Sequence, residues 1–81
     1  MKVRVKLFAV AKELASCDEL MVDLPTSATV SDLRQALAVE CPALSRILPH
    51  ALWAVGAEYA TGGTSLNEHS EVALIPPVSG G

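Results

Sequence analysis

The residues that most often carry chemistry in proteins are few in this sequence, and their spacing matches no common active site. Cysteine and histidine occur twice each, without the CxxC or HxxxH pair of a zinc or iron–sulfur site, at Cys17, Cys41, His50 and His69. Ser79 stands in VSG and not in the GxSxG of a nucleophile elbow. Gly62 and Gly63 lack the lysine and the spacing of a phosphate-binding loop. We expect no metal site and no active site in the interior of this protein.

The last two residues offer a different kind of chemistry. Gly80 and Gly81 have no side chains, so they form the thinnest and most flexible segment that a chain can make. The α-carboxylate of Gly81 is ionised at neutral pH. Such a segment can carry a carboxylate deep into a narrow slot of another protein. The alternative interpretation is an incidental glycine pair that frays, as short C-terminal segments often do.

Two prolines precede this segment and favour its projection from the fold. Pro76 and Pro77 stiffen the chain into an extended conformation at the exit from the last predicted strand. We therefore expect residues 1–75 to form the folded domain and residues 76–81 to form an extended tail.

Length and composition exclude several classes of protein. A chain of 81 residues and 8.5 kDa has room for one core and is too small for a TIM barrel or a pair of Rossmann units. Its hydrophobic fraction of 51% is high for so small a body, which suggests apolar surface intended for a partner. The net charge of −3 argues against nucleic-acid binding.

The sequence also lacks the signals of membrane insertion or export. No run of 18 apolar residues is present, and MKVRVKLF alternates charged and apolar residues, unlike a signal peptide. We expect a cytoplasmic protein with reduced cysteines and no bound cofactor.

Periodicity predicts an α+β domain. Residues 1–8 alternate with Val3, Val5 and Leu7 on one face, and Phe8 falls unexpectedly on the face of the lysines. A short helix over 9–15 and a second strand over 19–24 follow, and periodicity does not decide whether the two strands run parallel or antiparallel. Thr29 and Asp32 have the spacing of a capping box that begins a helix of about eleven residues, which Pro42 ends.

Three shorter strands complete the predicted order. They lie at residues 52–55, 58–60 and 71–75, with Gly56 and Ala57 as the turn between the first two. We predict a mixed sheet of four to five strands, covered on one face by the main helix.

The sequence resembles the small subunit of molybdopterin synthase, the MoaD-type sulfur carriers of the ubiquitin-like family. The terminal run of residues 71–81 carries the resemblance, and its ending PPVSGG, residues 76–81, is the most specific part. Leu7-Phe8-Ala9, Leu24-Pro25 and Thr29-Val30 add moderate support, and the similarity covers essentially the whole chain. The resemblance implies a ubiquitin-like β-grasp fold.

The resemblance also implies a mechanism. The carboxylate of Gly81 would be adenylated by an ATP-dependent, ubiquitin-activating-like enzyme and converted to a thiocarboxylate. The large subunit of molybdopterin synthase would accept the tail, and the sulfur would pass to a cyclic pterin precursor to form the dithiolene. Catalytic residues would then belong to the large subunit, in a complex of two small subunits flanking a large-subunit dimer.

The family's functional positions carry over to residues of this chain. Pro77, Val78, Ser79 and Gly80 would insert into the partner with Gly81. Phe8 and Ile75 would form an apolar docking surface beside the tail, with Tyr59 as a further member. The alternation agrees for Phe8 and Ile75, because both fall on the face opposite the predicted core.

Departures from the family pattern concern turns. His69-Ser70 stands where relatives commonly have Gly-Asp, and Gly56 replaces the usual asparagine, which leaves the geometry of both turns open. The alternative functions are a sulfur carrier or ubiquitin-like modifier for tRNA thiolation, thiazole synthesis or protein conjugation, and a plain binding module.

Overall fold

The alternation at the start of the chain forms the first strand of the fold. The computed structural model describes residues 1–77. Strand β1 (Lys2–Leu7) buries Val3, Val5 and Leu7 completely or nearly so and exposes the residues between them, as predicted. Phe8 follows directly and is 47% exposed.

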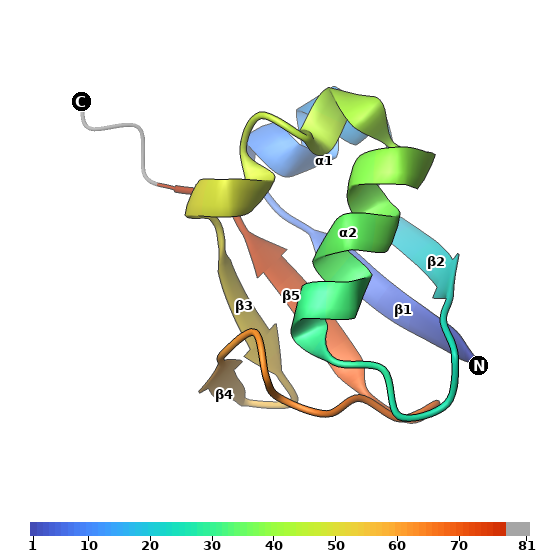
Figure 1. Cartoon of the computed structure of the whole chain (residues 1–81). Helices are drawn as coiled ribbons and strands as arrows, with labels where there is room; N and C mark the ends of the chain where they lie inside the picture. Colours follow the sequence, from blue (N-terminus) through green and yellow to red (C-terminus); the bar gives the residue numbers. More distant parts are fainter. Residues whose placement is uncertain (78–81) are drawn as a thin grey trace.

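Five strands form one mixed sheet in the order β2-β1-β5-β3-β4. β1 and β5 run parallel, whereas the β1/β2, β3/β5 and β3/β4 pairs are antiparallel. The parallel pair places strands from opposite ends of the chain side by side (Figure 1). The bounds of the remaining strands are β2 (Glu19–Asp23), β3 (Leu52–Val55), β4 (Glu58–Ala60) and β5 (Glu71–Ile75). The predicted α+β fold with a mixed sheet is confirmed.

A short helix reverses the chain between β1 and β2. Helix α1 (Val10–Ala15) buries Ala11 and ends at Ser16, whose φ of 58° is left-handed. The Leu7 N–H then donates to the Asp18 carbonyl oxygen over 2.9 Å, which begins the β1/β2 ladder. The orientation that periodicity left open is antiparallel, because the single short helix returns the chain to the same end of β1.

Helix α2 (Val30–Glu40) covers one face of the sheet (Figure 1). The predicted capping box is present: the Thr29 N–H donates to Asp32 Oδ2 over 2.9 Å, and the Asp32 N–H donates to Thr29 Oγ1 over 3.4 Å. Both contacts satisfy backbone N–H groups that the helix itself leaves unpaired. The helix ends at Glu40, before Pro42, as predicted.

The core lies between α2 and the sheet and contains no buried polar side chain among the described residues. Two 3-10 turns, η1 (Pro42–Leu44) and η2 (Leu48–His50), close one end of it with Leu44 and Leu48. Helix α2 contributes Val30, Leu33 and Leu37 to this core. None of the helices within residues 1–77 has the length and apolar character needed to traverse a membrane.

The two turns that depart from the family pattern have ordinary local explanations. Gly56 has a φ of 65° in the two-residue loop between β3 and β4, a conformation that costs glycine little. Before β5, the Asn67 side-chain oxygen accepts from the His69 N–H over 2.8 Å, and the Ser70 hydroxyl accepts from the Asn67 N–H over 2.9 Å. Side-chain hydrogen bonds of this type stabilise a turn without glycine.

The capping box gives a first test of the fold. Replacing Thr29 by alanine should lower the free energy of unfolding by about 1 kcal/mol, because the Asp32 N–H loses its acceptor. Thr29→Ser retains the oxygen and should cost much less. Urea unfolding followed by the fluorescence of Trp53, which is the only tryptophan and is 7% exposed, measures both variants. Equal stability of Thr29→Ala and the unmodified protein would contradict the capping interpretation.

Candidate functional site

The face of the sheet opposite α2 carries several exposed apolar side chains. Successive side chains of a strand point to opposite faces, so burial of Leu7, Trp53 and Leu74 under α2 directs their neighbours outward. We call this side the open face.

The register of the strands joins these outward residues into one surface. Leu7 pairs with Leu74, so Phe8 and Ile75 are the next residues on neighbouring strands. Leu52 of β3 pairs with Ile75 on the other side of β5. The next row joins Tyr59, Ala54 and Ala73 in the same way. The apolar surface therefore comprises Phe8, Leu52, Ala54, Tyr59, Ala73 and Ile75.

Exposure varies within the apolar surface. Tyr59 is 75% exposed, Leu52 55% and Phe8 47%, whereas Ile75 is partly buried. The structure brings Phe8 and Ile75 together, and Tyr59 lies on the same face two strands away from Ile75. Leu52 was not predicted, although the signal was present: the alternation that buries Trp53 requires Leu52 to point outward.

A strained turn fixes the backbone at Phe8. Ala9 has φ 51° and ψ −127°, a region that favours glycine. The turn is closed by the Ala11 N–H, which donates to the Phe8 carbonyl oxygen over 3.0 Å. Leu7 and Ala11 are buried on either side of it. Because packing holds both ends of the turn, Ala9 is kept in an unfavourable conformation and Phe8 is held on the open face.

Charged residues divide the open face into two regions. Lys6 pairs with Ala73 and so borders the apolar surface, whereas Arg4 pairs with Glu71 farther along β1. The Arg4 guanidinium Nε lies 2.7 Å from Glu19 Oε1. This exposed ion pair stabilises the fold only slightly.

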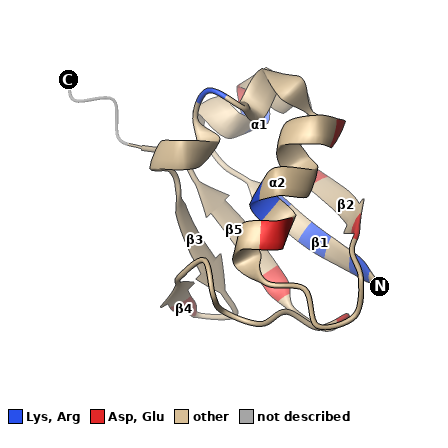
Figure 2. Ribbon diagram, viewed as in Figure 1, with Lys and Arg blue, Asp and Glu red and all other residues tan. Residues whose placement is uncertain are grey.

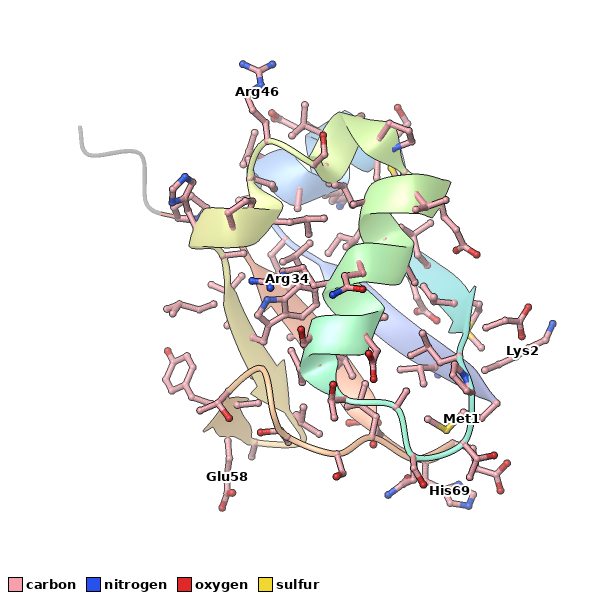
Figure 3. All side chains as sticks on the ribbon, viewed as in Figure 1. Met1, Lys2, Arg34, Arg46, Glu58 and His69 are labelled. Atoms are coloured by element: carbon pink, nitrogen blue, oxygen red, sulfur yellow. The ribbon has the colours of Figure 1, made fainter. Side chains whose placement is uncertain are left out.

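Acidic residues of the last third of the chain gather away from the end of β5. Glu71 begins β5 and Glu58 begins β4, whereas Ile75 is the last residue of β5 (Figure 2). Glu58 and His69 point outward at the end of the molecule opposite Arg46 (Figure 3). Glu58 and Glu71 therefore lie at the end of the sheet away from Ile75, whereas Lys6 borders the apolar surface near Phe8.

The predicted tail begins at the apolar surface. β5 ends at Ile75, Pro76 is buried and Pro77 is exposed. The predicted insertion residues Val78, Ser79 and Gly80 and the predicted reactive residue Gly81 lie outside the described residues. Their assignments, like the docking assignments of Phe8, Tyr59 and Ile75, remain predictions.

In the part of the chain that the structure describes, no group of three or more histidine, cysteine, aspartate or glutamate residues is placed to hold a metal ion.

Comparisons with known proteins match the chain over nearly its whole length. The model of the ThiS family matches residues 5–81. The chain is 37% identical to the molybdopterin synthase sulfur carrier subunit of Caenorhabditis briggsae, with 98% of this chain and 96% of that protein covered. Its sequence is 36% identical to that of small archaeal modifier protein 1 from Haloferax volcanii. The crystal structure of that protein matches with a TM-score of 0.88 and full coverage of both chains.

A more distant solved structure shares the fold. It is a complex of subunits 1 and 2 of the molybdopterin-converting factor from Helicobacter pylori, matched at 22% identity with a TM-score of 0.69 and full coverage of both chains. Together with the observed sheet and helix, these likenesses confirm the predicted ubiquitin-like β-grasp fold.

The strain at Ala9 predicts an unusual effect of glycine. Ala9→Gly should raise the free energy of unfolding by about 1 kcal/mol, because relief of the positive φ exceeds the entropy that glycine adds to the unfolded chain. Ala38→Gly in helix α2 is the matched control and should lower it by about 1 kcal/mol. Urea unfolding of both variants measures the difference. A change of the same sign in the free energy of unfolding of both variants would contradict backbone strain at Ala9.

Proposed function

This chain belongs to the ThiS family, and on that premise we propose that it is the sulfur carrier subunit of a molybdopterin synthase. The observation that carries the proposal is the set of curated relatives with that name, which are 31% to 37% identical and cover nearly the whole chain. The family match extends through residue 81, so it includes the glycine pair.

The proposed chemistry takes place on the carboxyl group of Gly81. An adenylating enzyme joins this carboxylate to the AMP portion of ATP and releases pyrophosphate. A sulfide-level sulfur nucleophile then displaces AMP, which leaves a thiocarboxylate. Activation is required because a free carboxylate is a poor electrophile, whereas AMP is a good leaving group. The thiocarboxylate sulfur attacks a carbon of the cyclic pterin precursor and displaces an oxygen leaving group from that carbon. Water then cleaves the acyl–sulfur bond, which restores the carboxylate of Gly81 and leaves the sulfur on the pterin. A second chain carrying a thiocarboxylate delivers the second sulfur of the dithiolene in the same way.

The proposal divides the work between this chain and its partners. The large subunit of molybdopterin synthase supplies the pocket and the acid–base residues, and a separate adenylating enzyme supplies the ATP site. The described residues of this chain support that division, because their core is apolar throughout and they hold no metal-binding cluster. The apolar surface is the proposed contact with the large subunit, since it adjoins Ile75 and the beginning of the tail.

A second candidate function is protein modification. The likeness to small archaeal modifier protein 1, at 36% identity, favours it nearly as strongly as the curated relatives favour the first. In that function the adenylated Gly81 would form an amide bond with a lysine of another protein, with AMP as the leaving group. Both functions use the same activated carboxyl group and differ in the nucleophile that receives it.

Removal of the last residue tests the proposed chemistry. A chain that lacks Gly81 should fail to support conversion of the pterin precursor when it is mixed with the adenylating enzyme, ATP, a sulfur source and the large subunit. Its circular dichroism and unfolding midpoint should not change, because the last strand, β5, ends at Ile75, before the removed residue. Intact mass spectrometry should find replacement of one oxygen by sulfur in the full chain only. Full activity of the truncated chain would reject the proposal.

A tryptic digest of cellular proteins separates the two candidate functions. No lysine or arginine follows Arg46, so trypsin would leave residues 47–81 attached to any modified lysine. Such a remnant on cellular proteins, without pterin conversion, would favour the modifier.

The apolar surface predicts a specific loss of affinity. Phe8→Ala should weaken binding to the large subunit by about 1–3 kcal/mol, because truncation removes an exposed aromatic anchor beside the tail. Val39→Ala is the matched control, since Val39 is 79% exposed on α2 and lies away from the open face. Isothermal titration calorimetry measures both. An unchanged dissociation constant for Phe8→Ala would exclude Phe8 from the interface.

A further inference from the structure

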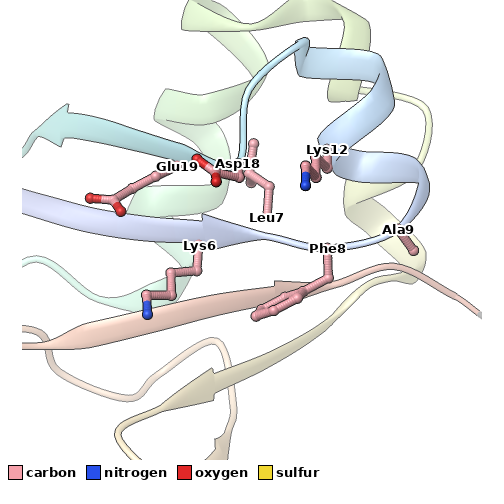
Figure 4. Close-up of a pocket in the computed structure, with 7 residues that line it drawn as sticks. All are labelled: Lys6, Leu7, Phe8, Ala9, Lys12, Asp18 and Glu19. Atoms are coloured by element: carbon pink, nitrogen blue, oxygen red, sulfur yellow. The ribbon is translucent and has the colours of Figure 1, made fainter.

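A recess opens at the corner of the sheet where β1 ends. Its volume is about 420 Å³, and its lining comes from the end of β1, from α1 and from the start of β2 (Figure 4). The lining residues are Lys6, Leu7, Phe8, Ala9, Lys12, Asp18 and Glu19. Lys6 and Phe8 point to the same side of β1, and Lys12 descends from α1 toward the end of the strand (Figure 4).

Two ammonium groups in this recess are available for a partner. Among residues 1–77, neither Lys6 nor Lys12 takes part in an ion pair. Glu19 pairs with Lys6 in the β1/β2 ladder, but its carboxylate is held by Arg4 at 2.7 Å. Asp18 contributes its backbone carbonyl oxygen to the ladder and also lines the recess, but its carboxylate forms no ion pair with either lysine within residues 1–77.

The recess is continuous with the apolar surface. Phe8 belongs to both, and Lys6 lies beside Ala73 of the apolar surface in the β1/β5 register. A protein that covers the apolar surface therefore brings its own side chains over Lys6 and to the recess that Lys12 lines from the side of α1 (Figure 4). Ammonium groups covered in this way lose hydration and require an opposite charge.

We infer that this recess receives a carboxylate side chain of the protein that docks on the apolar surface. The inference rests on the proposed function, because it identifies that protein as the large subunit. A single carboxylate matches the charge of the recess better than a phosphate group does, since Asp18 and Glu19 line the same space and repel a multiply charged anion. The apolar surface supplies binding area, and the recess supplies orientation and selectivity.

Matched charge removals test this inference. The chain has only three lysines, Lys2, Lys6 and Lys12. Lys2 lies on the same strand and the same face as Lys6, at the far end of β1, so Lys2→Gln is the control for the general effect of charge. Binding of each variant to the purified large subunit is followed by stopped-flow kinetics at low and high salt. Circular dichroism confirms that each variant folds.

The recess predicts a position-dependent result. Lys6→Gln and Lys12→Gln should each reduce affinity by about 3- to 10-fold at low salt, largely through slower association, and should reduce the dependence on salt. Lys2→Gln should change affinity by less than about twofold, because its charge lies far from the contact. Carbodiimide treatment of the complex should cross-link the large subunit's carboxylates to Lys6 or Lys12 and not to Lys2.

Three outcomes would overturn the inference. They are equal effects of all three variants, no effect of Lys6→Gln and Lys12→Gln, and cross-links confined to Lys2. If Phe8→Ala weakens binding while the lysine variants do not, the inference about the recess fails and the proposed function stands. If the unmodified chain does not bind the large subunit at all, the proposed function fails and this inference fails with it.

Discussion

The parallel pairing of β1 with β5 is the constraint on which the rest of the structure depends. It joins residues 4–7 to residues 71–74, nearly the whole length of the chain apart, at the middle of the sheet. β2 can then pair only on the outer side of β1, and β3 only on the outer side of β5. The same register places Phe8 next to Ile75, so the first strand contributes to the surface from which the tail departs.

The two faces of the sheet differ in what they contribute to stability. On the side of α2, the residues from β1, β5 and β3 are buried, and they are aliphatic apart from Trp53. Burial of apolar surface is the main favourable contribution to folding, so this side holds the domain together. Each residue on the open face is the sequence neighbour of a buried residue in the same strand, but its own side chain contributes little to that core. Changes there can alter binding while leaving the fold intact, which makes the open face the natural place for a partner.

Local features of the fold followed from the sequence, whereas long-range features did not. The strands at residues 52–55, 58–60 and 71–75 and the capping box at Thr29 depend on neighbouring residues, and the structure matches the predictions. Strand order and the antiparallel β1/β2 pair depend on contacts between distant segments, which periodicity does not contain. The recess involves Lys12 because α1 folds back over the end of β1, an arrangement invisible in the spacing of the lysines. The positive φ of Ala9 could not be predicted either, because positive φ is expected at glycine and not at alanine.

The small size of the domain limits the kind of chemistry that it can perform. Within residues 1–77, a core composed only of apolar side chains provides no buried polar group to shift a pKa or to orient a substrate, and such groups are what most active sites require. A chain under that limit can still take part in a reaction if the reactive group lies outside the core and the environment comes from a partner. A docking surface must then do what a pocket does in an enzyme, which is to fix the position of the reactive group. The strained turn at Ala9, the aligned strands β1, β5 and β3, and the recess with Lys6 and Lys12 all lie at the end of the domain where β5 leaves the sheet, which is where such a docking surface would fix the position of a group carried beyond Ile75.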